Sequence, residues 1–295
     1  MDYIVYILFR IAVFKAWVLP FRLLYILSDI LAFFLERVIK YRKKVIYANL
    51  KMCFPEKTDK EIATIASKFY LNLSDIILES IKGFSMNEKQ LLKRYVFSDK
   101  VYLKKYFEEK RQVICTGGHY SNWEWGVLTM GLQYPNMHFG AYKPLSNKFI
   151  DAYIVRKRTR PNMTLVTMEE TVRVMKNQKG TPSLFVLIAD QSPSSHKKAV
   201  WIDFFDTKTA CVPGVEISAK LFDMGVVYMV SKRIKRGYYR VDLTPVTDNP
   251  GATEKGFITQ QYMKHLEDDI RERPEWWLWS HRRWKHRYED VFGVH

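Results

Sequence analysis

Three short apolar stretches, each ending in polar residues, constrain the fold of this chain most. They cover residues 113–116, 183–189 and 226–231, and they end at Gly117-Gly118-His119, at Asp190-Gln191 and at Lys232-Arg233. A helical pattern over 123–132 follows the first of them, so the order is strand, turn, helix. This order predicts an α/β fold. Because ligands of α/β sheets bind at the carboxyl ends of the strands, we expect the polar tails to converge on one site.

The rest of the chain contains one strong helical pattern and no sign of a second domain. Residues 57–84 carry apolar side chains at three- and four-residue spacing, which predicts one long helix or two shorter ones ending near Gly83. No internal repeat and no Gly/Ser-rich linker interrupts the 295 residues. We therefore expect one domain over 41–295, preceded by a segment of different character over 1–40.

The segment 1–40 is rich in Ile, Leu, Phe, Val and Tyr, but charged residues interrupt it. Four of them recur every seven positions, at Lys15, Arg22, Asp29 and Glu36. On a helix they form one stripe and leave the remainder apolar, and Pro20 is expected to kink or split that helix. We expect a retained membrane anchor that spans the bilayer or lies in its interface. The alternative is a core helical hairpin of a soluble protein.

The segment from Gly117 to Glu124 carries the clearest chemical signal. Its imidazole, His119, and its carboxylate, Glu124, are five positions apart, which on a continuous helix is about 140°. They can meet only if His119 lies outside the helix, and the double glycine permits such a tight turn. A carboxylate that accepts from one ring nitrogen leaves the other free as a general base. The spacing therefore favours a dyad that activates a hydroxyl.

Each of these residues also has a purely structural interpretation. Ser121 and Glu124 have the spacing of a capping box, in which both side chains satisfy the first amides of a helix. His119 alone is compatible with a hydrogen-bonded surface histidine, and Asp190 with a turn residue. The three cysteines are far apart, and no metal-ligand pair of fixed spacing and no nucleotide fingerprint occurs. We expect no metal and no nucleotide cofactor.

The net charge of +16 makes the chain attractive to polyanions. Arg156, Arg158 and Arg160 alternate, so in an extended stretch they share one face that suits phosphate or carboxylate. A second basic cluster, over 281–287, follows the tryptophans of 276–279. That mixture suits a membrane interface as well as it suits nucleic acid. The charge by itself leaves both partners open.

Six motifs in chain order resemble one known family. They are Arg42-Lys43-Lys44 with Cys53-Phe54-Pro55-Glu56, His119 with Glu124, Arg156 with Arg158, Asp190-Gln191, Phe204-Phe205, and Trp279-Ser280-His281-Arg282-Arg283-Trp284-Lys285. The family is that of the lipid A late acyltransferases, the lauroyl and myristoyl transferases of Gram-negative bacteria, within the lysophospholipid acyltransferase superfamily. The resemblance covers nearly the whole chain.

The resemblance implies a glycerol-phosphate-acyltransferase-like domain, in which helices flank a mixed central sheet, and a membrane anchor at the cytoplasmic face of the inner membrane. It implies that His119 is a general base oriented by Glu124, and that no cofactor takes part. The residues it assigns to substrate binding are Arg156, Arg158, Asp190, Gln191, Arg282 and Arg283. The implied donor is acyl carrier protein or acyl-CoA, and the implied acceptor is a hydroxyl of a lipid A precursor.

Two rival functions remain compatible with the sequence. The same dyad serves an acyltransferase that acts on a lysophospholipid or an aminolipid. A basic nucleic-acid-binding protein is the other, but it gives the apolar N-terminus no purpose, so we expect no nucleic acid. For the thioester oxyanion, the turn amides around Gly117 and the guanidinium of Arg156 or Arg158 are the candidate donors.

Overall fold

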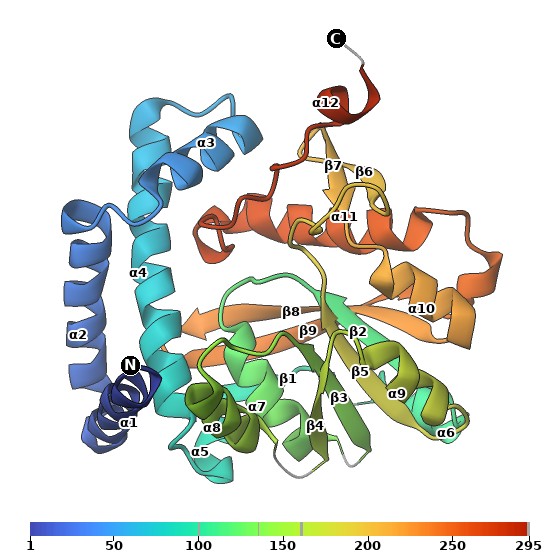
Figure 1. Ribbon diagram of the computed structural model, residues 1–295, viewed down its shortest axis with the longest axis horizontal. Coiled ribbons are helices and arrows are strands. Elements are labelled where there is room, and N and C mark those ends of the chain that lie inside the picture. The colour runs from blue at the N-terminus through green and yellow to red at the C-terminus, as the bar shows by residue number, and fades with distance from the viewer. Residues whose placement is uncertain (100, 135, 160–161, 294–295) are drawn as a thin grey trace.

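A mixed seven-stranded sheet forms the centre of the computed structural model, which describes residues 1–99, 101–134, 136–159 and 162–293 (Figure 1). The strand order is β1-β9-β8-β2-β5-β3-β4. All neighbours are parallel except β8 and β9. The strands are β1 (Tyr95–Phe97), β2 (Val113–Gly117), β3 (Met137–Tyr142), β4 (Met163–Thr167), β5 (Ser183–Ile188), β8 (Gly225–Lys235) and β9 (Tyr238–Thr247). The predicted α/β fold with a mixed central sheet is confirmed.

Strands β2 and β5 lie in the middle of the sheet, and nearly all of their side chains are buried. Continuous apolar runs of this kind are typical of parallel strands covered on both faces. The pairing runs from Val113 opposite Leu184 to Gly117 opposite Ile188. Since both strands end at the same level, the residues that follow Gly117 and Ile188 emerge side by side.

Helices cover both faces of the sheet (Figure 1). Alternate residues of β2 show this, because Ile114 packs in one core with Leu266 of α11 (Phe257–Glu272). Cys115 packs in a second core with Trp125 of α7 (Trp123–Gln133). The long helix predicted over 57–84 is a single helix, α4 (Asp59–Gly83), and a capping box of Thr58 and Glu61 begins it.

Shorter elements complete the domain. They are α3 (Lys43–Cys53), α5 (Glu88–Arg94), α6 (Lys104–Glu108), α8 (Lys148–Arg158), α9 (Thr171–Asn177), α10 (Gly214–Phe222), α12 (Tyr288–Phe292), the 3₁₀ turns η2 (Pro250–Ala252) and η3 (Pro274–Trp276), and an antiparallel ribbon of β6 (Val200–Phe204) and β7 (Thr207–Cys211).

The N-terminal segment folds as two helices, α1 (Asp2–Val18) and α2 (Phe21–Phe33), followed by a π-helical turn η1 (Phe34–Val38). Pro20 separates α1 from α2, as predicted. In the part of the chain that the structure describes, no helix is both long enough and apolar enough to cross a membrane. The predicted membrane-anchoring helix is therefore not found. The division of the chain at residue 40 stays a prediction.

Candidate active site

The site is built on the turn that follows β2, where two glycines allow backbones to approach closely. A Cβ on Gly117 would lie 2.4 Å from the carbonyl oxygen of Met229 in the neighbouring strand β8. A Cβ on Gly118 would lie 2.7 Å from Leu266 of α11. A side chain at Gly117 would meet backbone, and one at Gly118 would require Leu266 to move. The double glycine thus lets the turn pass between β8 and α11 and present His119 at the edge of the sheet.

Asp190 reaches the same turn from the end of β5. Its Oδ1 lies 2.6 Å from Nδ1 of His119, and its Oδ2 accepts from the backbone N–H of His119 at 2.9 Å. The indole N–H of Trp277 donates to the same Oδ2 at 2.9 Å. Asp190 is only 2% exposed. The prediction that the tails of β2 and β5 converge is confirmed.

The third predicted tail does not reach this site. Strand β8 continues to Lys235, so Lys232 and Arg233 lie within it rather than after it. Lys232 forms an ion pair with Asp269 of α11, and Arg233 forms one with Asp75 of α4. The apolar pattern ends at Ser231, but pairing with β9 extends the strand beyond it. The predicted strand end was therefore wrong.

The partner of the imidazole also differs from the sequence prediction, because Asp190 and not Glu124 engages Nδ1 of His119. Glu124, in the first turn of α7, forms an ion pair with Arg158 of α8. The ring of Trp123 packs edge-on against the imidazole, with the centroids 5.1 Å apart. The helix start thus brings Trp123, not Glu124, against the ring. The carboxylate of Glu124 acts on His119 through its charge.

The alternative capping box is wrong as well. The N-cap of α7 is Asn122, whose Oδ1 accepts from the backbone N–H of Trp125 at 3.0 Å. Ser121 has φ +53°, and its N–H donates to the carbonyl of Trp276 at 2.8 Å. Asn is as good an N-cap as Ser, so residue preference does not decide which of the two caps the helix. The start of α7 at Trp123 was predicted correctly.

The two groups have perturbed titrations. Burial lowers the pKa of His119, but the charge and hydrogen bond of Asp190 and the charge of Glu124 raise it, and the net pKa is above the ordinary 6.5. Burial raises the pKa of Asp190, but His119 and the indole of Trp277 outweigh it and hold that pKa at about 2. Asp190 is therefore ionised at neutral pH and accepts the Nδ1 proton, which leaves Nε2 as the basic nitrogen.

Gln191 lies at this free nitrogen, as expected for a residue of the site. Its side-chain Nε2 is 3.5 Å from Nε2 of His119. The next residue, Ser192, donates its backbone N–H to Nε2 of His281 at 3.0 Å. The loop that follows β5 is thus held between the site and the C-terminal segment. His281 was not among the predicted site residues, although it belongs to the terminal motif.

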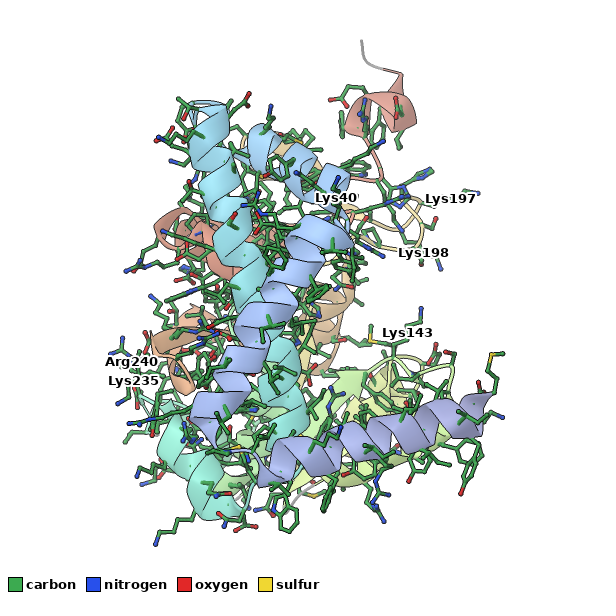
Figure 2. The ribbon with its side chains drawn as sticks, turned by 90° about the vertical axis from the view of Figure 1, so that its left-hand side faces the viewer. Lys40, Lys143, Lys197, Lys198, Lys235 and Arg240 are labelled. Carbon is green, nitrogen blue, oxygen red and sulfur yellow. The ribbon has the colours of Figure 1, made fainter. Side chains whose placement is uncertain are left out.

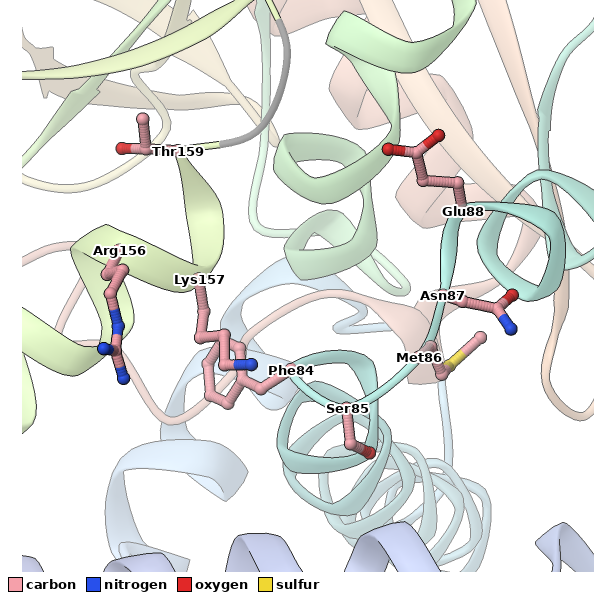
Figure 3. A pocket seen from close by; sticks show the side chains of 8 residues that line it. All are labelled: Phe84, Ser85, Met86, Asn87, Glu88, Arg156, Lys157 and Thr159. Atoms are coloured by element: carbon pink, nitrogen blue, oxygen red, sulfur yellow. The ribbon is translucent and has the colours of Figure 1, made fainter.

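The arginines predicted to share one face are separated. Arg156 and Arg158 are on helix α8, where side chains two positions apart diverge by about 200°. Arg158 pairs with Glu124, next to the site. Arg156 lines a different hollow of about 350 Å³, between the end of α8 and the segment from Phe84 to Glu88 (Figure 3). Arg160 lies outside the described residues.

The terminal basic cluster divides in the same way. Arg283 is 1% exposed and donates to the carbonyl of Ala210 at 2.6 Å and to Sγ of Cys211 at 2.7 Å. It holds strand β7 inside the protein, and its predicted contact with substrate stays a prediction. Arg282 is exposed. Trp277 and Trp279 are buried, so they are not available as a stacking platform for nucleic acid or lipid.

An apolar cavity of about 50 Å³ lies between α7 and the sheet, and sequence reasoning missed it. Gly118, Tyr120 and Trp123, which are close to His119 in the chain, line it. Other lining residues come from α7 and from the strands, among them Val127, Met130, Val186, Met229 and Val241. These positions are far apart in sequence, and only α7 carries several of them. The cavity thus adjoins the turn that holds His119, because Gly118 and Tyr120 flank that residue.

The arrangement suits proton transfer. An ionised carboxylate fixes the tautomer of His119 and stabilises the imidazolium that forms when Nε2 takes a proton. Across the described ranges, His, Cys, Asp and Glu side chains form no group of three that could hold a metal ion. The chemistry that the visible residues offer is general-base activation of a nucleophile beside an apolar cavity.

Comparison with known proteins gives a consistent result. The family model described as bacterial lipid A biosynthesis acyltransferase matches residues 1–286. A lipid A biosynthesis lauroyltransferase of Escherichia coli (strain K12) is 25% identical over 276 residues, which cover 92% of this chain and 89% of the relative. A palmitoleoyltransferase of the same organism is 25% identical over 283 residues, 95% and 90% of the two chains. A Haemophilus influenzae lipid A biosynthesis acyltransferase is 21% identical over 269 residues, 88% and 81%.

Proposed function

Since the chain belongs to the bacterial lipid A biosynthesis acyltransferases, we propose that it moves a fatty acyl chain from acyl carrier protein to a hydroxyl of a lipid A precursor, with His119 as general base. The observation that carries the proposal is the pairing of His119 Nδ1 with the buried carboxylate of Asp190 at 2.6 Å. This pairing directs Nε2 outward as the proton acceptor.

The proposed reaction needs no acyl-enzyme. Nε2 of His119 takes the proton of the acceptor hydroxyl while the oxygen attacks the thioester carbonyl. The tetrahedral intermediate then expels the thiolate of the carrier, and the imidazolium returns the proton to that sulfur. Asp190 stabilises the imidazolium throughout. Glu124 adds a second negative charge near the ring, in place of the orienting contact expected from the sequence.

The apolar cavity beside the turn supports a lipid substrate. Clefts that bind small molecules are mostly apolar with a few polar groups at one end. Here the polar pair of His119 and Gln191 stands beside an apolar cavity, which Gly118 and Tyr120 line on either side of His119 in the chain. At about 50 Å³ the cavity is smaller than the roughly 300–1,000 Å³ of such clefts, so an acyl chain would have to widen it to enter beside the base.

We also propose that the enzyme works at the cytoplasmic face of the inner membrane, where α1 and α2 lie in the interface. Large apolar side chains on these helices are exposed, among them Leu8, Phe14, Trp17, Ile26 and Phe33. Helices with such faces bind membrane interfaces. Figure 2 shows α1 and α2 across the front of the molecule, with Lys40 beside the end of this segment and Lys143 and Lys197 toward the right-hand edge. Cations there attract anionic headgroups and an acidic carrier protein.

The test is acyl transfer by wild type, His119→Ala and a control, His265→Ala, which changes a histidine of α11 whose ring stacks on Tyr228. Each is given labelled acyl carrier protein with a Kdo-bearing lipid A precursor or a panel of lysophospholipids, and mass spectrometry identifies the product. We expect acylated lipid A precursor from wild type and control, and a rate lower by at least about 10²–10⁴-fold for His119→Ala.

The same assay separates the rival acceptors. Product on a lysophospholipid alone would keep the base and replace the acceptor. Full activity of folded His119→Ala would refute the general-base role. Absence of product with wild type and every acceptor, while the donor stays intact, would refute the proposed reaction.

A further inference from the structure

We propose that Glu79 of α4 is a positioning residue that orients the catalytic turn through Asn122, an inference that rests on the proposed base role of His119. Glu79 is 0% exposed. Its Oε2 accepts from Nδ2 of Asn122 at 2.6 Å and from the hydroxyl of Tyr239 at 2.6 Å. Its Oε1 accepts from the hydroxyl of Tyr25 at 2.8 Å. One buried carboxylate thus joins α2, α4, α7 and β9.

The contact with Asn122 determines which way that amide faces. Burial raises the pKa of Glu79, against the charge of Arg233 and the hydrogen bonds of Tyr239 and Tyr25, which lower it. In its ionised form Glu79 accepts hydrogen bonds and donates none, so it selects the NH₂ group of Asn122. The amide oxygen of Asn122 is then turned toward the helix, where it caps the backbone N–H of Trp125. With the opposite orientation, the NH₂ group would face the N–H of Trp125, and two donors would oppose each other. Glu79 therefore ensures that the cap of α7 forms.

The cap lies three residues after His119 and controls what touches the imidazole. Trp123, the first residue of α7, packs edge-on against the ring of His119. Ser121, between them, has a positive φ of +53°, a conformation that non-glycine residues adopt only when their surroundings hold them there. Glu79 holds the helix at a second point, because its carbonyl accepts from the indole N–H of Trp125 at 2.8 Å.

The same carboxylate also contacts the N-terminal helix α2, through an atom that Asn122 does not use. The hydroxyl of Tyr25 in α2 donates to Oε1 of Glu79, whereas Asn122 donates to Oε2. Two further contacts hold α2 independently of Glu79: Ser28 donates to Asp75 at 2.6 Å, and Asp29 pairs with Arg236. Tyr25 can therefore be changed without touching the Asn122 contact and without releasing α2. It provides the matched control.

The first experiment compares Glu79→Met, Glu79→Gln and Tyr25→Phe by kcat, KM and thermal unfolding. Methionine keeps the length but accepts nothing useful from Asn122, so kcat should fall by up to about 10²-fold, the effect of slightly misplaced groups, with KM little changed. Glutamine can place its oxygen toward Asn122 and its NH₂ toward the Tyr25 oxygen, and it should restore kcat. Tyr25→Phe should lower the unfolding temperature but leave kcat unchanged.

A double-mutant cycle tests the route through Asn122. Serine at 122 caps Trp125 with a hydroxyl that rotates freely and needs no orientation. Glu79→Met should therefore lower kcat much less in an Asn122→Ser background than in the parent. If Glu79→Met does not fold, Asn122→Ala tests the proposal instead, because it removes the same hydrogen bond from the Asn122 side. This single substitution should by itself lower kcat.

Two results would overturn the proposal. One is a loss of thermal stability in Glu79→Met with an unchanged kcat. The other is an equal loss of kcat in both backgrounds of the cycle. Failure of the proposed function is distinguishable, because wild type itself would then give no acylated product.

Discussion

The carboxylate that pairs with His119 lies 71 residues further along the chain, at the end of another strand. The nearby acid, Glu124, pairs with Arg158 instead. Two adjacent parallel strands that end at one level bring Asp190 against His119, whereas the five-residue spacing to Glu124 does not give such a contact. The pairing gives His119 a pKa above 6.5, since Asp190 and Glu124 outweigh burial. These residues therefore determine how the activity depends on pH.

We predict that kcat/KM rises with pH through an inflection above 6.5, because the base must be neutral. Asp190→Asn removes the main group that raises the pKa of His119, so the inflection should move to lower pH and the rate should fall by about 10²-fold or more. Glu124→Gln should move the inflection in the same direction by less. Initial rates with saturating donor across the pH range measure both. An unmoved inflection in Asp190→Asn would contradict the pairing.

At the scale of elements, helix α7 and the sheet enclose the apolar cavity, and the same helix begins beside His119. A substitution on α7 at the cavity can therefore act in two ways. It can change the volume of the cavity, or it can disturb the turn that holds His119. Val127 lines the cavity and is half-buried, one turn away from Trp123. A larger side chain can be placed at Val127 while the Asn122 cap of α7 stays intact.

We predict that Val127→Phe shifts the product toward shorter acyl chains. The larger ring fills the space, and each methylene that a pocket excludes costs about tenfold or more in discrimination. A mixture of carrier-bound chains of several lengths, with products counted by mass spectrometry, measures the shift. Val127→Ala is the control and should not favour shorter chains. An unchanged product distribution in a folded Val127→Phe protein would show that the acyl chain lies elsewhere.

At the scale of the whole molecule, the chain combines a large positive charge with exposed apolar helices. The chain carries a net charge of +16. The helices α1 and α2 expose Phe14 and Trp17, which are 59% and 57% exposed. Exposed side chains of this size contribute little to folding, so their replacement tests a surface rather than a core.

We predict that the double substitution Phe14→Ser with Trp17→Ser weakens binding to vesicles that contain anionic lipid. Less apolar area then enters the membrane interface. The basic side chains still bind the anionic lipid, and this remaining binding is sensitive to salt. Flotation with vesicles at low and high salt measures both contributions. Phe257→Ser, a change at an exposed position of α11, is the control and should bind as wild type does. Equal binding by the double variant would contradict the interface proposal.

Local pattern predicted the elements that depend on neighbours in the chain. The apolar runs of β2 and β5, the period of α4 and the break at Pro20 are all found where expected. The position of His119 in a turn was also predictable, because two glycines precede it. The helical geometry of Arg156 and Arg158 was not, since two alternating charges read equally well on a strand or on the end of a helix.

The sequence by itself therefore determined the class of fold, the turn that carries His119 and, through six ordered motifs, the family. Only the tertiary structure decided that Asp190 is the partner of His119, that Arg283 is buried and that Glu79 lies against Asn122. The physical reason is range. Helical period and turn chemistry act over a few residues, whereas strand order and burial decide which distant side chains share a hydrogen bond.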